Sequence, residues 1–221
     1  NMASANSVNI GRLLPQIAYY FYIYSQVAKN GEEIYVSVPS GNFGNAVAGL
    51  FARRMGLPIR LIIAVNENDV FARFYNSGIY APAAKTKSSP SNSMNVNWPS
   101  NIRRLFQLYG GQLIEGKYPD NPDRKVISSL ILPDLRRLRK EIAAYSITDN
   151  ETHDLVAEFY DKKYTIGAAV HSTIEPHGAV AWGAAQRFRR QTGYEGTIVT
   201  IETAHPGKFP ESLERMGIKP D

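Results

Sequence analysis

The chain has 221 residues, of which 43% are hydrophobic and 20% charged, a composition typical of a globular protein with one sizeable core. It has no cysteine, which excludes disulfides, thiolate metal sites and a cysteine nucleophile. The net charge is +5, but no recognition module accompanies the scattered basic residues, and no apolar run approaches the roughly 20 residues that span a bilayer. We therefore expect a cytoplasmic protein that binds neither nucleic acid nor membrane.

The first third of the chain predicts a helix followed by a strand–helix–strand unit. Helical spacing of apolar residues extends from Ile10 to Lys29, with Asn9 or Ser7 as a cap and Pro15 separating the first turn. The buried side of this helix is predicted to carry Leu13, Leu14, Ile17, Phe21, Tyr24 and Ala28. The elements that follow are a strand at 33–38, a helix at 46–55 and a strand at 59–65. A continuous apolar strand such as 59–65 is typical of a parallel sheet that is covered on both faces.

The region from about 70 to 150 is less regular. Residues 81–97 are rich in Ser, Pro, Lys and Asn, which predicts a loop. A helix is predicted over 100–109 and another over 125–145, broken near Pro133. The spacing of Thr148 and Glu151 is that of a capping box, so a helix should follow to about Asp161.

The last third returns to alternating helix and strand. A helix is predicted from Glu175 to Gln191, closing at Gly193, and a strand over 196–202. Thr203 then lies at the carboxyl end of a strand, where open α/β sheets bind their ligands. The sequence thus predicts an α/β fold with a mainly parallel open sheet and helices on both faces.

The turn after the first predicted strand is a candidate anion site. Residues Ser37 to Asn45 read SVPSGNFGN and join a strand to a helix, an arrangement that presents backbone N–H groups to one anion. Gly41 and Gly44 would permit positive φ and close approach to a phosphate, and Ser40, Asn42 and Asn45 could hydrogen-bond it. The spacing matches neither the nucleoside triphosphate nor the dinucleotide fingerprint. On spacing alone, an ordinary strand-to-helix turn explains the segment equally well.

This segment resembles the phosphate loop of the threonine synthase family, fold-type II enzymes that use pyridoxal 5′-phosphate (PLP). Three other segments agree with the family in the same order: Ser4 to Asn9 followed by Arg12, Asn66 to Asp69 followed by Arg73, and Thr203 to Pro206 followed by Lys208. The likeness extends from about Ala3 to Pro210. It implies a three-layer, tryptophan synthase β-like PLP-dependent fold, of which residues 1–221 form the C-terminal part, with the looser region at about 70–150 as an insertion.

The resemblance also implies roles for individual residues. The PLP phosphate would lie on the loop, and the hydroxyl of Thr203 would meet the pyridine nitrogen. The substrate O-phosphohomoserine carries a second phosphate, which Ser7 and Arg12 would bind, with Asn9 as a contributor or as a helix cap. The cofactor-binding set is therefore Ser40, Gly41, Asn42, Phe43, Gly44, Asn45 and Thr203.

The whole enzyme of this family converts O-phosphohomoserine and water to threonine and phosphate. The lysine that binds PLP covalently belongs to a stretch that the family carries before the segment matched by Asn1, so we expect no catalytic residue here and no turnover without that N-terminal half. A surface that the N-terminal half would cover favours self-association. The four histidines show no metal-ligand spacing. His177 and His205 lie near predicted strand ends, where they could line the active cleft, but they are interpreted as loop-shaping residues.

Two other interpretations stay open. Another fold-type II enzyme, such as a threonine or serine dehydratase, would share the loop but handles no phosphorylated substrate, which the pair Ser7 and Arg12 argues against. A non-catalytic phosphate-binding module would keep the loop without the lysine. Asp69 and Arg73 match family positions, but an ion pair between residues four apart on a helix explains them equally well.

Overall fold

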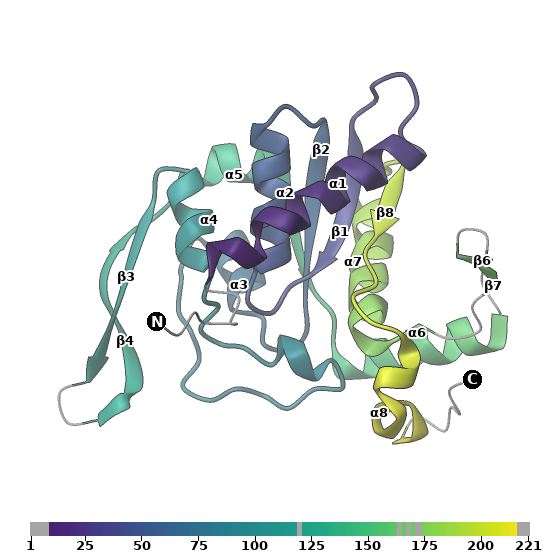
Figure 1. Ribbon diagram of the computed structural model, residues 1–221. Coiled ribbons are helices and arrows are strands. Elements are labelled where there is room, and N and C mark those ends of the chain that lie inside the picture. Colours follow the sequence, from purple (N-terminus) through teal and green to yellow (C-terminus); the bar gives the residue numbers. More distant parts are fainter. Residues whose placement is uncertain (1–8, 119–120, 163–164, 167–168, 171–173, 216–221) are drawn as a thin grey trace.

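The core of the molecule is a four-stranded sheet. The computed structural model describes residues 9–118, 121–162, 165–166, 169–170 and 174–215. Its central strands have the order β5-β2-β1-β8, and every neighbouring pair is parallel (Figure 1). The strands are β1 (Ile34–Pro39), β2 (Ile59–Val65), β5 (Ile142–Ser146) and β8 (Ile198–Thr200). The predicted α/β fold with a mainly parallel sheet is confirmed.

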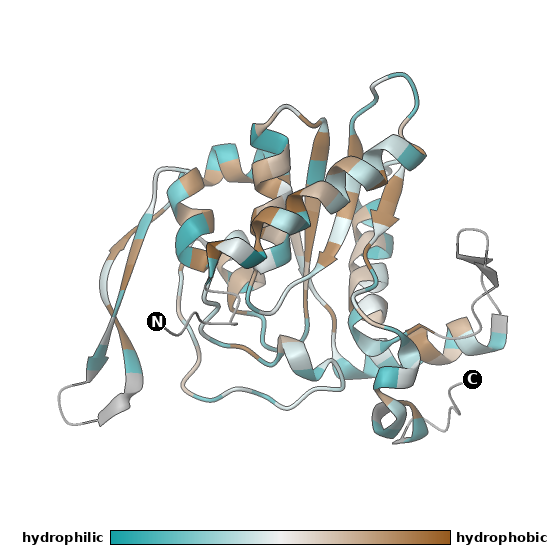
Figure 2. Cartoon of the chain, in the orientation of Figure 1, coloured by the Kyte–Doolittle hydropathy of each residue, from teal (hydrophilic) through white to brown (hydrophobic). Residues whose placement is uncertain are grey.

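Helices cover both faces of this sheet because β1 and β2 are buried on both sides. On one face Val36 and Leu61 belong to the largest apolar cluster, which includes residues of α1 (Leu14–Val27) and α2 (Gly44–Arg54). On the other face Ile62 packs against α7 (Pro176–Thr192), in a second cluster. The two strands are accordingly among the most apolar parts of the chain (Figure 2).

The remaining elements lie around this sheet. The helices are α3 (Val70–Ser77), α4 (Ile102–Leu108), α5 (Leu135–Glu141), α6 (Asp149–Lys162) and α8 (Pro210–Arg215). Short 3-10 turns are η1 (Ile10–Arg12), η2 (Asn92–Met94) and η3 (Pro206–Lys208). Two antiparallel pairs stand apart from the central sheet, β3 (Gln112–Tyr118) with β4 (Asn121–Ile131) and β6 (Thr165–Ile166) with β7 (Ala169–Val170).

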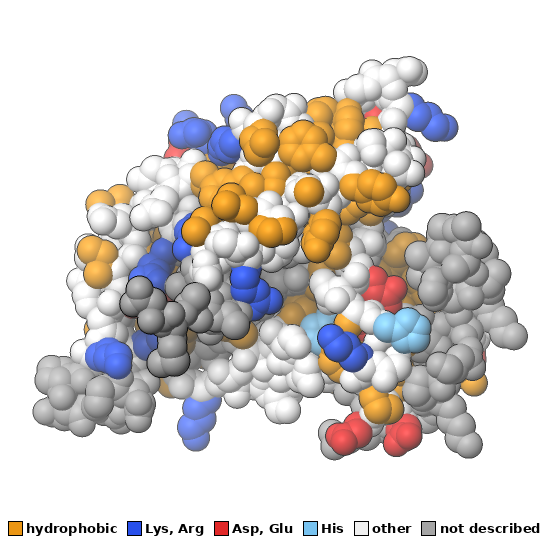
Figure 3. All heavy atoms as spheres, viewed as in Figure 1, with side chains coloured by type: hydrophobic (Ala, Val, Ile, Leu, Met, Phe, Trp, Pro, Cys, Tyr) orange, Lys and Arg blue, Asp and Glu red, His pale blue; other side chains and the backbone are white. Residues whose placement is uncertain are grey.

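The first predicted helix is divided into η1 and α1, as expected, but the division falls at Leu13, and Pro15 lies in the first turn of α1. Its predicted buried side is partly wrong, because Leu14 is 55% and Phe21 38% exposed, whereas Tyr20 is fully buried. Helix α1 packs against α2 on the side of Tyr20, whereas the apolar or aromatic side chains of Leu14, Tyr19, Phe21 and Tyr22 on its other sides are exposed. Apolar side chains therefore gather on the surface over α1 (Figure 3).

The predicted helix over 125–145 is wrong over most of its length. Residues up to Ile131 form β4, which pairs with β3, and α5 begins only after Pro133. The residues that follow α5 form β5, which pairs with β2 as an edge strand of the central sheet. Both strands are stabilised by pairing with residues that are distant in sequence. The spacing of apolar residues within 125–145 carries no information about such partners, so it predicted a helix.

Predictions that rest on local side-chain chemistry are confirmed. The backbone N–H of Glu151 donates to Thr148 Oγ1 at 3.2 Å, and the N–H of Thr148 donates to Glu151 Oε2 at 2.9 Å, which is the reciprocal capping box at the start of α6. Helix α7 ends at Gly193, whose φ is +68°. The segment 81–97 is a loop with η2 as its regular element.

Candidate functional site

The loop that follows β1 lies at the carboxyl edge of the sheet. Ser40 is buried there, and its hydroxyl donates to the Val38 carbonyl at 3.0 Å, within its own turn. The positive φ that sequence reasoning assigned to Gly41 or Gly44 occurs instead at Phe43, with φ 62°. A left-handed conformation is costly for a residue with a side chain, and the surrounding structure must hold it. The buried Phe43 ring packs edge-on against Phe71, with 4.9 Å between ring centroids, which supplies that support.

Gly41 is required by close packing rather than by its backbone angles. A Cβ atom at this position would lie 2.6 Å from the Ser93 carbonyl oxygen and 2.9 Å from the Met94 Cα. The η2 turn therefore rests directly on the loop. Asn42 is fixed from another side, since its Oδ1 accepts the Ser100 N–H at 3.2 Å and its carbonyl accepts Asn101 Nδ2–H at 3.0 Å.

Helix α2 begins with its N-terminal amides directed out of the loop. Its first helical hydrogen bond joins the Val47 N–H to the Phe43 carbonyl at 3.0 Å, so the N–H groups of residues 44–46 precede the helical ladder. In the part of the chain that the structure describes, no side chain caps this helix. Uncapped amides at a helix N-terminus bind an anion readily.

Helix α1 is held against the start of α2 by a contact from the middle of α1. The buried Tyr20 hydroxyl donates to the carbonyl of Asn45 at 3.0 Å and to its Oδ1 at 2.5 Å. A Cβ atom on Gly49 would lie 2.6 Å from the Tyr20 ring, so the glycine lets the two helices approach. Burial raises the pKa of the Tyr20 phenol, which stays a neutral donor. Arg12, one turn before α1, is thereby placed over the loop.

These elements enclose an open cavity of about 290 Å³. It is lined by Arg12 and Gln16, by the loop from Pro39 to Asn45, by Ser93 and Met94, and by His177 and Thr203. The structure thus unites the predicted loop, Arg12 and Thr203, which come from three separate segments of the sequence. Ser7 lies outside the described residues. Asn9 is a cap, since its Oδ1 accepts the Gly11 N–H at 2.9 Å, and it does not line the cavity.

Sequence reasoning missed the contributions of Glu175 and η2, and it preferred a loop-shaping role for His177, which the structure places in the lining of the cavity. His177 is 3% exposed; its Nδ1 lies 2.5 Å from Glu175 Oε2, and its Nε2 accepts the Ser93 N–H at 3.1 Å. The Glu–Pro–His sequence was a signal for the start of a helix, but nothing in the order of residues connects it to Ser93. His205 is a loop-shaping residue as predicted, because its Nδ1 accepts the Gly207 N–H at 3.1 Å.

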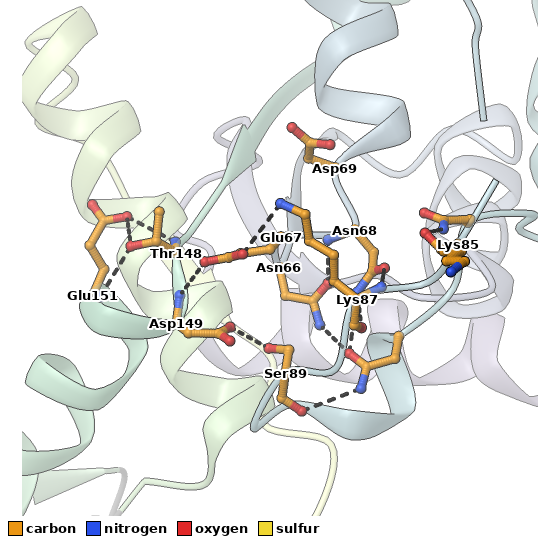
Figure 4. A network of polar contacts seen from close by, with 12 residues as sticks. Asn66, Glu67, Asn68, Asp69, Lys85, Lys87, Ser89, Thr148, Asp149 and Glu151 are labelled. Atoms are coloured by element: carbon orange, nitrogen blue, oxygen red, sulfur yellow. Dashed lines mark hydrogen bonds and ion pairs between the residues drawn. The ribbon is translucent and has the colours of Figure 1, made fainter. Parts of the chain in front are cut away.

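A second polar segment follows the neighbouring strand β2 but serves the fold. Asn66 is fully buried and donates through Nδ2 to Ser91 Oγ at 3.0 Å and to Asn95 Oδ1 at 2.9 Å. Asn68 Oδ1 accepts the Lys87 N–H at 2.8 Å (Figure 4). These bonds fasten the loop 85–97 to the end of β2. Asp69 forms the ion pair with Arg73, at 2.8 Å.

None of the residues that line the cavity, all within the described ranges, is a lysine. Among the described residues no helix is both long and apolar enough to cross a bilayer.

Comparison with known proteins gives a consistent result in sequence and in structure. No family model matches the chain. A threonine synthase from Escherichia coli is 38% identical over 215 residues, 96% of this chain and 42% of that protein. A crystal structure of threonine synthase from Escherichia coli superposes with a TM-score of 0.75 at 35% identity, covering 99% of this chain and 44% of that one. A PLP-bound threonine synthase from Brucella melitensis gives a TM-score of 0.77 at 28% identity and covers 99% and 46%. The chain spans less than half the length of the relatives that it matches.

Proposed function

We propose that this chain, which is related to the threonine synthases over nearly its whole length, supplies the phosphate-binding side of a PLP-dependent lyase. The complete enzyme would convert O-phospho-L-homoserine and water to L-threonine and phosphate. The observation that carries the proposal is the cavity itself, because it brings the loop after β1, Thr203 and Arg12 together. Each of these is expected to contact a different part of the cofactor or substrate.

The cofactor phosphate would bind at the N-terminus of α2. The uncapped amides of residues 44–46, the turn at Gly41 to Phe43 and the side-chain amide of Asn45 suit a phosphate there, and Ser40, predicted as a contact, would have to give up its bond to the Val38 carbonyl to join them. The loop is fixed before any ligand arrives, since Asn42 and Gly41 are tied to the segments beside them. Thr203 faces the same cavity and would contact the pyridine ring. When bound, PLP would serve as an electron sink for the carbon that loses a proton.

The phosphate of the substrate would bind Arg12. A guanidinium is permanently charged and can bind a phosphate through two parallel hydrogen bonds, whereas the α2 amides already serve the first phosphate. Two phosphates would thus be held by two different kinds of donor. Ser7 would add a hydroxyl, and Asn9 would fix the turn before Arg12 through its cap.

Catalysis would need a residue that the cavity does not contain. The lysine that binds PLP covalently would come from the remainder of a longer enzyme, so the 221-residue chain would bind phosphates without turning over substrate. We place the enzyme in the cytoplasm, on the strength of the cysteine-free sequence and the family's biosynthetic reaction.

The experiment that tests the proposal is calorimetric titration of the chain with two probes. One is 4′-deoxypyridoxine 5′-phosphate, a PLP analogue that lacks the aldehyde and needs no lysine; the other is O-phospho-L-homoserine, added to the complex of the first. Arg12→Ala should weaken binding of the second probe by about tenfold to a hundredfold, the effect of losing one to two charged hydrogen bonds, and leave the first nearly unchanged.

Arg136→Ala is the matched control, because Arg136 is an exposed arginine on α5 that does not line the cavity. It should change neither affinity. Failure of the wild-type chain to bind the PLP analogue would refute the proposed cofactor role. Equal weakening of both probes by Arg12→Ala would refute the assignment of the substrate phosphate to Arg12 and of the cofactor phosphate to the α2 amides.

A further inference from the structure

Glu175 is a fully buried carboxylate with no solvent contact, and its bonds reach two walls of the cavity. Its Oε1 accepts the Gly178 N–H at 2.9 Å and lies 3.4 Å from Thr203 Oγ1. Its Oε2 accepts the His177 N–H at 2.8 Å and lies 2.5 Å from His177 Nδ1. The carboxylate therefore caps α7 and also contacts two side chains that line the cavity.

The protons of this cluster can be assigned from its geometry. His177 Nε2 accepts the Ser93 N–H, so it carries no proton, and the ring proton is on Nδ1, where it donates to Glu175. An ionised carboxylate only accepts, so the Thr203 hydroxyl is the donor in its contact with Oε1. His177 is accordingly a neutral link whose two nitrogens are both engaged by the protein.

The same cluster reaches the opposite wall through η2. Ser93, which His177 holds by its N–H, is the residue whose carbonyl lies against Gly41 of the loop. The His177 ring is supported by Phe209, with 5.0 Å between ring centroids. One buried carboxylate is thus linked both to Thr203 and, through His177 and Ser93, to the loop at Gly41.

We propose that Glu175 is a positioning residue of the cavity: it orients the Thr203 hydroxyl and, through His177, holds Ser93 against the loop. It thereby fixes the distance between Thr203, which would contact the pyridine ring, and the loop, which would bind the cofactor phosphate. This inference rests on the proposed function, since it assigns the ring to Thr203 and the phosphate to the loop. Gly178 and Thr203 donate to Oε1, and His177 donates to Oε2. A neutral amide at this position has only one accepting oxygen, so it can serve either the pair Gly178 and Thr203 or His177, but not both.

The test measures binding of 4′-deoxypyridoxine 5′-phosphate and of inorganic phosphate to the whole chain by calorimetry. Glu175→Gln should weaken binding of the ring-bearing probe by about tenfold, the effect of leaving a buried donor without an acceptor. Its effect on inorganic phosphate should be smaller, about threefold or less, because the α2 amides are unchanged. Glu175→Asp keeps the charge, both accepting oxygens and a good helix cap, and should restore most of the affinity.

A double-mutant cycle with Thr203→Val separates positioning from a purely structural role. If Glu175 acts through Thr203, adding Glu175→Gln to Thr203→Val should cost much less for the ring-bearing probe than it costs alone. Additive effects, or wild-type affinity in Glu175→Gln, would overturn the inference while leaving the proposed function intact. Absence of any binding of the ring-bearing probe to the wild-type chain would overturn the proposed function and this inference with it.

The matched control is Asp134→Asn, at the residue that caps α5 through hydrogen bonds to Arg136 N–H and Arg137 N–H and does not line the cavity. It should alter neither affinity. Thermal unfolding of each variant reports whether it folds. If Glu175→Gln does not fold, the cycle is made with Glu175→Asp and Thr203→Val. A residual loss of affinity in Glu175→Asp that disappears in the Thr203→Val background supports the inference, whereas wild-type affinity in Glu175→Asp, or a loss that persists in that background, refutes it.

Discussion

The loops after β1 and β2 are built from similar residues but have different surroundings. Each follows a buried parallel strand, ends at the carboxyl edge of the sheet and carries asparagines. After β1, the side-chain oxygen of Asn42 accepts the Ser100 N–H, and the loop faces a cavity. After β2, Asn66 and Asn68 are buried, and their amides bind the segment 85–97 (Figure 4).

The difference shows that residue type and position on a sheet do not by themselves define a binding site. Asn66 and Asn68 have the same side chains as Asn42 and Asn45, but they differ in their bonds: Asn66 and Asn68 donate through Nδ2 to the segment 85–97. The bonds described above for Asn42 and Asn45 engage their oxygens. A polar group in the interior must be paired with protein, water or ligand. A loop whose amides precede a helix without a side-chain cap keeps donors for an external anion, and this is the condition that α2 meets.

The largest effect is expected in the loop after β2. Asn66→Ala removes a fully buried amide together with its hydrogen bonds to Ser91, to Asn95 and to the backbone N–H of Asn68. The free energy of unfolding should fall by about 2–4 kcal/mol. Urea unfolding followed by circular dichroism measures it. Asn76→Ala, at an exposed position near the end of α3, is the control and should change stability by less than about 0.5 kcal/mol.

The second largest effect is expected in the loop after β1, where a change at Gly41 should lower both the stability of the protein and its affinity for phosphate. Gly41→Ala places a Cβ 2.6 Å from the Ser93 carbonyl, so either the loop or η2 must move. We expect a loss of about 1–3 kcal/mol in stability and a weaker affinity for inorganic phosphate. Gly110→Ala is the comparison, because a Cβ there meets no atom within 4 Å and only the positive φ of 78° opposes it. Unchanged phosphate affinity in Gly41→Ala would contradict the role of η2 as a support for the loop.

A smaller effect tests the bond between α1 and the loop. Tyr20→Phe removes the hydroxyl that donates to Asn45 and keeps the ring that packs against Gly49. The expected loss of stability is about 1 kcal/mol, the typical net contribution of one hydrogen bond. Thermal unfolding monitors this loss, and titration with inorganic phosphate shows whether Asn45 is displaced. A stability equal to that of the wild type would mean that the helices are held by apolar packing alone.

The smallest effect is a pH dependence in the capping box that begins α6. Partial burial raises the pKa of Glu151, but hydrogen bonds from the backbone and side chain of Thr148 and from Arg187 lower it further, and the net pKa is below its usual 4.5. Because the folded pKa is the lower one, the stabilisation is complete above pH 4.5 and is lost as the pH falls through the folded value. Glu151→Gln should therefore be less stable than wild type by about 0.5 kcal/mol at pH 7.

Urea unfolding at a series of pH values between 7 and 3 checks this sign. The difference between Glu151→Gln and wild type should shrink toward zero at the acidic end. A difference that grows as the pH falls would contradict the assigned direction of the pKa shift.

The sequence by itself determined the parallel strand–helix–strand core, the two caps at Thr148 and Gly193, and the loop at Ser40 to Asn45. Each of these depends on residues that are neighbours in the chain, so apolar spacing, cap chemistry and turn residues were enough to find them. The family resemblance added Arg12 and Thr203 to the same site. The structure brings both to one cavity with the loop.

Only the tertiary structure decided which of the polar segments faces a cavity and which is used internally. It also converted residues 121–131 into a strand, exposed Leu14 and Phe21 on α1, and placed Glu175 between Thr203 and His177. The physical reason is the same in each case. Strand pairing, burial of one side of an apolar helix and the pairing of a buried carboxylate all depend on partners that are distant in sequence and become neighbours only when the chain folds.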